Sequence, residues 1–178
     1  MKGLANNIGS MLLKRKRKQI ERKTEVQNFK IAKSAYIIFD TSMAESFSII
    51  KDFNKYLNSE NINCKAIGIV SQKEIPSEML FWDTYEYITK KELTWFKKPK
   101  GEVADAFLAA KPDILFDFTF NAPLEVQYLV QLSLSKFKIG CYTEEANDYD
   151  LMINAGNTCE LGFFVDQIKH YVNMLNPS

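Results

Sequence analysis

Ala35-Tyr-Ile-Ile-Phe-Asp40 is the stretch that decides the fold, because it is a continuous run of β-forming apolar residues that ends in a carboxylate. Such a run is typical of a strand buried on both faces of a parallel sheet. Similar runs recur over residues 64–70 and 114–119, with helical periodicity between them. The sequence therefore predicts an α/β fold: a single Rossmann-like domain with a mostly parallel sheet and helices on both faces.

Weaker patterns predict the remaining elements. Shorter apolar runs predict three more strands, over residues 85–89, 137–140 and 149–153. Residues 93–96 are either an edge strand or a loop packed over the sheet. Helical periodicity predicts a helix after each of the strands that end at Asp40 and Thr119, and two more over residues 103–110 and about 159–175.

Several polar residues are candidate helix caps. Ser42 and Glu45 have the spacing of a capping box, which predicts that Ser42 caps the first helix of the α/β domain. Asn121 is the candidate N-cap of the helix that follows residues 114–119, and Asn157 or Thr158 caps the last helix.

Length and composition exclude several protein classes. The 178 residues are 46% hydrophobic and 25% charged, as in globular domains, which excludes disordered and collagenous chains. The sequence contains no run of about 18 apolar residues, so it predicts no membrane-spanning helix. Cys64, Cys141 and Cys159 lack metal-binding spacing, and His170 is the only histidine, so we expect free thiols in a reducing cytoplasm and no metal site. The cations follow the first apolar stretch, the reverse of a secretory leader.

The N-terminal region has a charge opposite in sign to that of the rest of the chain. Residues 1–34 hold ten basic and two acidic residues, a net charge of +8, whereas residues 35–178 hold 13 basic and 20 acidic residues, a net charge of −7. This asymmetry is typical of a chain with a polyanionic partner. We expect a basic N-terminal helical extension over residues 1–33 and the Rossmann-like domain over residues 34–178.

Apolar residues open this extension, and cations follow them. Leu4, Ile8, Met11 and Leu12 recur at helical spacing. Because each residue turns a helix by about 100°, the five consecutive cations that come next surround the helix and cannot all be hidden in a core. The residues expected to bind a polyanion are Lys14, Arg15, Lys16, Arg17, Lys18, Arg22 and Lys23.

The basic extension has three interpretations. The leading hypothesis is a cytoplasmic, non-enzymatic binding protein whose basic helix docks on structured RNA or the ribosome, where cations that contact phosphates release counterions. One alternative is peripheral association with an anionic surface such as the inner membrane through the same helix. Another is a solvated helix with no partner. Trp82, Trp95 and Phe96 could stack on bases, although aromatic residues in such domains usually lie in the core.

Polar residues after two expected strands form a candidate ligand cleft. Ligands of open α/β sheets bind beyond the carboxyl ends of the strands. The residues at these two ends are Asp40, Thr41, Ser42, Asp117, Thr119 and Asn121. The turn after Asp40 contains no glycine, so the sequence has no phosphate-binding loop, and we expect neither a catalytic residue nor a cofactor. Asp117 is interpreted as a structural carboxylate that accepts hydrogen bonds from loop N–H groups.

Two resemblances add to these expectations. Pro112-Asp-Ile-Leu-Phe-Asp-Phe-Thr119, a helix and Ser135-Lys-Phe-Lys-Ile-Gly140 together resemble the N-terminal half of heptosyltransferase-type GT-B glycosyltransferases. This resemblance spans about residues 34–155 and implies a further alternative, a degenerate half-domain that binds a nucleotide or small metabolite. The chain also resembles uncharacterised small Bacteroidota proteins in which a basic helix precedes a strand like Ala32-Lys-Ser-Ala-Tyr-Ile-Ile-Phe-Asp40, and this second resemblance implies no activity.

Overall fold

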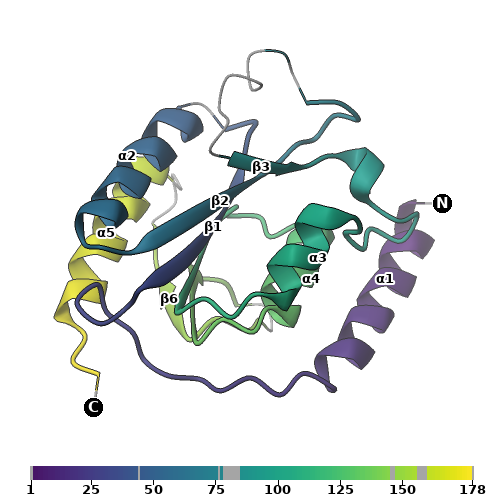
Figure 1. Cartoon of the computed structure of the whole chain (residues 1–178). Coiled ribbons are helices and arrows are strands. Elements are labelled where there is room, and N and C mark those ends of the chain that lie inside the picture. The colour runs from purple at the N-terminus through teal and green to yellow at the C-terminus, as the bar shows by residue number, and fades with distance from the viewer. Residues whose placement is uncertain are drawn as a thin grey trace.

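A computed structural model describes residues 2–43, 45–75, 77, 85–144, 147–155 and 160–177, without the Lys2 side chain. Six strands within these ranges form one sheet in the order β3-β2-β1-β4-β5-β6 (Figure 1). They are β1 (Ser34–Asp40), β2 (Asn63–Ile69), β3 (Tyr85–Ile88), β4 (Ile114–Phe118), β5 (Phe137–Cys141) and β6 (Leu151–Ile153). Every neighbouring pair is parallel, which confirms the predicted Rossmann-like α/β class.

The helices cover both faces of this sheet. They are α1 (Lys2–Arg17), α2 (Ser46–Ser59), α3 (Glu102–Ala109), α4 (Leu124–Leu132) and α5 (Leu161–Met174), with a short 3-10 helix, η2 (Lys90–Glu92). In Figure 1, α2 and α5 lie on one side of the sheet, α3 and α4 lie on the other, and α1 lies outside α4. The basic N-terminal helix is therefore a third layer on the α4 side of the domain.

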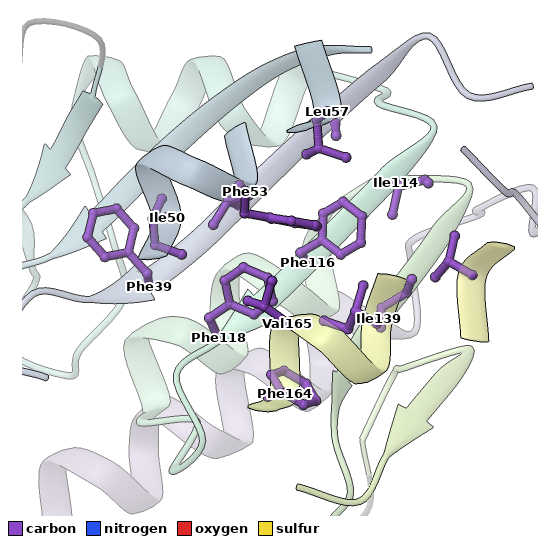
Figure 2. Close-up of a cluster of buried hydrophobic side chains, with 14 of the residues drawn as sticks. Phe39, Ile50, Phe53, Leu57, Ile114, Phe116, Phe118, Ile139, Phe164 and Val165 are labelled. Carbon is purple, nitrogen blue, oxygen red and sulfur yellow. The ribbon is translucent and has the colours of Figure 1, made fainter. Parts of the chain in front are cut away.

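Side chains that alternate along the strands divide the core into two parts. Phe39, Phe116 and Ile139 point toward α2 and α5, where Phe53 meets Phe116 edge-to-face with ring centroids 5.1 Å apart (Figure 2). Ile38 and Leu115 point toward α3 and α4. The odd and even positions of each strand therefore serve different helices, as expected for a sheet covered on both sides.

The predicted capping box is wrong, because α2 begins at Ser46 with Glu45 as its N-cap, and Asp40 accepts the Ser42 N–H that a capping box would give to Glu45. Asp40 Oδ1 accepts from the Ser42 N–H at 2.8 Å and from the Ser42 hydroxyl at 2.7 Å. Glu45 itself precedes α2, in a left-handed conformation with φ of 58°. This local turn uses both hydrogen-bond donors of Ser42 three residues before the N-cap of α2, so Ser42 does not cap the helix.

The cap predicted at Asn121 is also wrong, since α4 begins after Pro123, which offers no capping side chain. The alternatives at residues 93–96 resolve as a loop. Leu93 and Pro99 form an isolated antiparallel bridge, and Lys97 takes a positive φ of 70° between them. We call residues 93–99 the 93–99 loop. Trp82 and the caps proposed at Asn157 and Thr158 lie outside the described residues.

Candidate functional site

Helix α1 is fixed to the domain at a point of close backbone approach. A Cβ atom at Gly9 would lie 2.3 Å from the carbonyl oxygen of Phe96 and 2.8 Å from Leu124 Cδ2, so the crossing requires glycine. The buried Tyr128 hydroxyl of α4 donates a hydrogen bond of 2.7 Å to the Gly9 carbonyl. Leu13 packs beside this bond with Tyr128. The orientation of α1 against α4 and the 93–99 loop is therefore well determined.

This docking divides the predicted apolar stripe between two faces of α1. Ile8 and Leu12 are partly buried, and the residue that enters the core is Leu13, which is 2% exposed. Leu4 and Met11 are 65% and 62% exposed. These four apolar residues do not share one buried face, because the face that α1 buries is centred on Gly9 and Leu13. Leu4 and Met11 lie on the opposite side of the helix.

Three of the predicted cations extend this outer face. Lys14, Arg15 and Lys18 are exposed, and Asn7, Ser10 and Met11 line the same shallow surface with them. None of the three cations forms an ion pair with another described residue, although the domain carries a net negative charge. Their charges are consequently available to an external partner.

Two other predicted cations are committed to the domain. The Arg22 guanidinium donates two hydrogen bonds of 2.7 Å to the carboxylate of Asp150. The Arg17 Nε donates to Asp148, which also lies 3.6 Å from the Lys138 ammonium. Arg17 and Arg22 therefore anchor the end of α1 and the segment after it to the loop between β5 and β6. Lys23 forms an exposed ion pair with Glu25.

Lys138 of β5 is the buried centre of this ionic network. Its side chain is inaccessible to solvent, and its Nζ donates a hydrogen bond of 2.6 Å to the carbonyl oxygen of Val130. Burial lowers the pKa of Lys138 to about 8, with a contribution from the neighbouring positive charge of Arg22, while Asp148 opposes the shift. The ammonium form is therefore held in the fold at a cost in stability near neutral pH.

We expect stability to rise with pH because of Lys138. Its pKa is about 8 in the folded chain and near the ordinary 10.5 when unfolded, so between these values the unfolded chain binds more protons. The free energy of unfolding should rise by about 2 kcal/mol over the first ~1.5 pH units above pH ~8, at about 1.4 kcal/mol per unit. Urea titrations measure this increase as a rise with pH in the free energy of unfolding of the wild type relative to that of Lys138→Met. A constant difference would contradict it.

A second basic segment, which the sequence analysis missed, lies against α1. Lys16 points toward the 93–99 loop, where the positive charge of Lys98 lowers the pKa of Lys16. Trp95 of the same loop is 67% exposed and meets Phe96 edge-to-face. The signal was present as Trp95-Phe-Lys-Lys-Pro-Lys100, which follows an aromatic pair with three lysines. We call the area formed by Lys14, Arg15 and Lys18 on the outer face of α1 the basic surface.

The predicted ligand cleft is brought together only in part. Asp117, Thr119 and Asn121 line a cavity of about 250 Å³ between the carboxyl ends of β4 and β5 and helix α4. Residues 40–42 do not line it. The Thr41 hydroxyl donates a hydrogen bond of 3.0 Å to the carbonyl oxygen of Ile69, and Ser42 bonds Asp40. The first strand end is thus occupied by its own turn, and the cavity lies one strand away from it.

The structure also bears on metals, disulfides and membrane spans. Across the described ranges, no group of three His, Cys, Asp or Glu side chains is placed to hold a metal ion. No disulfide links the described cysteines Cys64 and Cys141. A helix long and apolar enough to cross a bilayer is absent from the part of the chain that the structure describes.

Comparison with known proteins identifies a family. The chain matches a family of unknown function (DUF6913) over residues 6–175. The match starts within α1 and continues to the residue after α5, so it includes the basic surface and the cavity. No curated protein matches the chain.

Proposed function

We propose that this chain, which belongs to the family of unknown function DUF6913, is a binding protein that docks on structured RNA, such as that of the ribosome, through its basic surface. The observation that carries the proposal is that some cations of the N-terminal region pair with the domain whereas others remain exposed. Arg17 and Arg22 pair with domain carboxylates, whereas Lys14, Arg15 and Lys18 remain exposed on the outer face of α1 without an ion pair among the described residues.

The fixed position of α1 supports this proposal. A helix that is already folded and docked loses little conformational entropy when it binds, so its cations contribute more fully to affinity. Lys16 and Lys98 add a pair of like charges that repel each other in the free protein. A phosphate bound beside them would relieve this repulsion. The same contact would release counterions from the nucleic acid.

Trp95 favours a nucleic acid as the polyanion. Its exposed indole lies in the 93–99 loop, which contacts α1 at Gly9 and also carries Lys98. RNA is recognised largely through unpaired bases that stack on aromatic side chains, together with cations that contact the backbone. An exposed tryptophan in a loop that also carries lysines offers both kinds of interaction.

The test is the salt dependence of binding to a labelled, folded RNA. The triple variant Lys14→Gln, Arg15→Gln and Lys18→Gln should bind about tenfold more weakly and show a shallower dependence on salt between about 50 mM and 200 mM, because fewer counterions are released. Fluorescence anisotropy and co-sedimentation with ribosomes measure the loss. The control is Lys30→Gln, Lys55→Gln and Lys73→Gln, which removes the same charge from other exposed positions. Equal binding by the two variants would overturn the proposal.

Leu4 and Met11 favour one other candidate, an anionic membrane surface. Both are exposed on the face that carries Lys14 and Arg15, which is the arrangement of a helix that lies in a lipid interface. Flotation with phosphatidylserine vesicles should then be lost in Leu4→Asp with Met11→Asp. RNA binding should be reduced much less by the same changes. Flotation together with no RNA binding would replace the RNA proposal by the membrane one.

A further inference from the structure

The cavity beside α4 has a polar wall and a buried carboxylate. Its described lining includes the amides of Asn121, Gln127 and Gln131 and the hydroxyl of Thr119. Asp117, which also lines it, is 3% exposed. Its volume of about 250 Å³ is several times the ~30 Å³ that one water molecule occupies in the liquid, so the cavity is large enough for a small organic molecule.

Three donors from the protein hold Asp117 in place. Its Oδ1 accepts from the Thr119 N–H at 2.8 Å and the Thr119 hydroxyl at 2.7 Å, and its Oδ2 accepts from the Tyr149 hydroxyl at 2.6 Å. A carboxylate offers about four acceptor positions, so one remains. Burial raises the pKa of Asp117, and the bonds from Tyr149 and Thr119 oppose this increase.

Gly140 places Tyr149 at this site. A Cβ atom at Gly140 would lie 2.4 Å from Tyr149 Cε1, so a larger residue at this position would displace the ring. From there the Tyr149 hydroxyl reaches the Asp117 carboxylate on the neighbouring strand. The cavity is therefore a shaped site in which two strands and the following loop each supply a required group.

The charges around the cavity select the kind of ligand. Asp117 forms no ion pair with another described residue, and burying an unpaired carboxylate is costly. The second carboxylate of the lining, Asp148, is already neutralised by Arg17 and Lys138. No lysine, arginine or histidine lies among the described lining residues. A phosphate or sugar nucleotide would meet Asp117 without a compensating cation, so this lining disfavours anionic ligands.

We propose that this cavity binds a small molecule that carries a primary ammonium group, which pairs with Asp117 and hydrogen-bonds the surrounding amides. The ammonium takes the remaining acceptor position of the carboxylate and supplies the cation that the protein does not. The carbonyl oxygens of the amide side chains accept its other protons, and their NH2 groups remain for polar substituents of the ligand. This site is independent of the basic surface.

The experiment compares two probes that differ by one group. Ethanolamine has an ammonium group where ethylene glycol has a hydroxyl. Titration of the full chain with each probe at constant ionic strength, followed by NMR, should give saturable shifts of the Ala122, Gly140 and Thr143 amides with ethanolamine at millimolar concentrations. Ethylene glycol should give none. Asp117→Asn, which keeps the size of the side chain and the oxygen that accepts from Thr119, should weaken binding at least tenfold.

A matched variant separates local from general charge effects. Asp166→Asn removes the same charge from an exposed position on α5, and its ethanolamine affinity should equal that of the wild type. Near-ultraviolet circular dichroism confirms that Asp117→Asn remains folded, and a Tyr149→Phe variant, expected to lose part of the affinity, replaces it if not. Absence of saturable shifts with ethanolamine, or equal binding of ethylene glycol, overturns the proposal.

Discussion

Gly9→Ala should release α1 from the domain and lower the free energy of unfolding by about 3 kcal/mol, the upper end of the usual cost of overpacking. The new methyl group would lie 2.3 Å from the carbonyl oxygen of Phe96, and a backbone group cannot rotate away as a side chain can. Moving α1 outward breaks the buried hydrogen bond from Tyr128 to Gly9. A helix of 16 residues is only marginally stable alone in water, so α1 should also unfold.

Gly3→Ala is the matched control, because it makes the same change in the same helix. A Cβ atom at Gly3 would have no neighbour within 4 Å. Alanine in an exposed helix is more favourable than glycine by about 1 kcal/mol, so this variant should be slightly stabilised. Hydrogen exchange of the α1 amides should accelerate about a hundredfold in Gly9→Ala and not in Gly3→Ala. Equal exchange in the two variants would show that the crossing at Gly9 does not hold the helix.

Asp148→Asn should cost about 2 kcal/mol near pH 7, less than the usual cost of breaking a buried ion pair, because Lys138, with a pKa of about 8, can lose its proton once the carboxylate is gone. Asp148 is the carboxylate shared by Arg17 and the solvent-inaccessible Lys138. Its removal leaves the Lys138 ammonium buried with only a carbonyl oxygen as a bonded partner. Equilibrium unfolding in urea, with two-state behaviour checked by fluorescence and circular dichroism, measures the cost.

A double-mutant cycle assigns this cost to Lys138. In a Lys138→Met background the buried ammonium is gone, and Asp148→Asn then removes only the pair with Arg17, which is partly exposed. We expect the cost of Asp148→Asn to fall to about 1 kcal/mol in that background, as for exposed ion pairs. An unchanged cost would mean that Asp148 acts through Arg17 and not through Lys138.

The strands could be predicted from the sequence because a strand that is buried on both faces consists mainly of apolar residues. The runs that became β1, β2 and β4 are mainly apolar, with Lys65 in β2 and Asp117 in β4 as the charged residues inside them. The caps could not be predicted in this way. Spacing alone does not show that Asp40 will take the hydrogen bonds of Ser42, since this depends on the angle at which the chain leaves the sheet.

The candidate sites were predictable in composition and not in geometry. The cations of the N-terminal extension are visible in the sequence, but their separation into anchors and exposed groups depends on Asp148 and Asp150, more than 120 residues later. Gly9 resembles a helix breaker in the sequence, whereas in the structure it is the position that allows helix docking. Asp117 was expected to accept bonds from loop N–H groups, which the bond from the Thr119 N–H confirms, but the Tyr149 contact was not foreseen.

The partners that meet at the Gly9 crossing are synthesised far apart in time. Tyr128 is separated from Gly9 by 119 residues, so at bacterial or eukaryotic rates of translation the first helix is made roughly ten seconds before the helix that receives it. During that interval the nascent chain has no surface on which α1 can be held, and parallel pairing of β1 with β4 must wait as well. Assembly of the N-terminal layer is therefore a late event in the maturation of this protein.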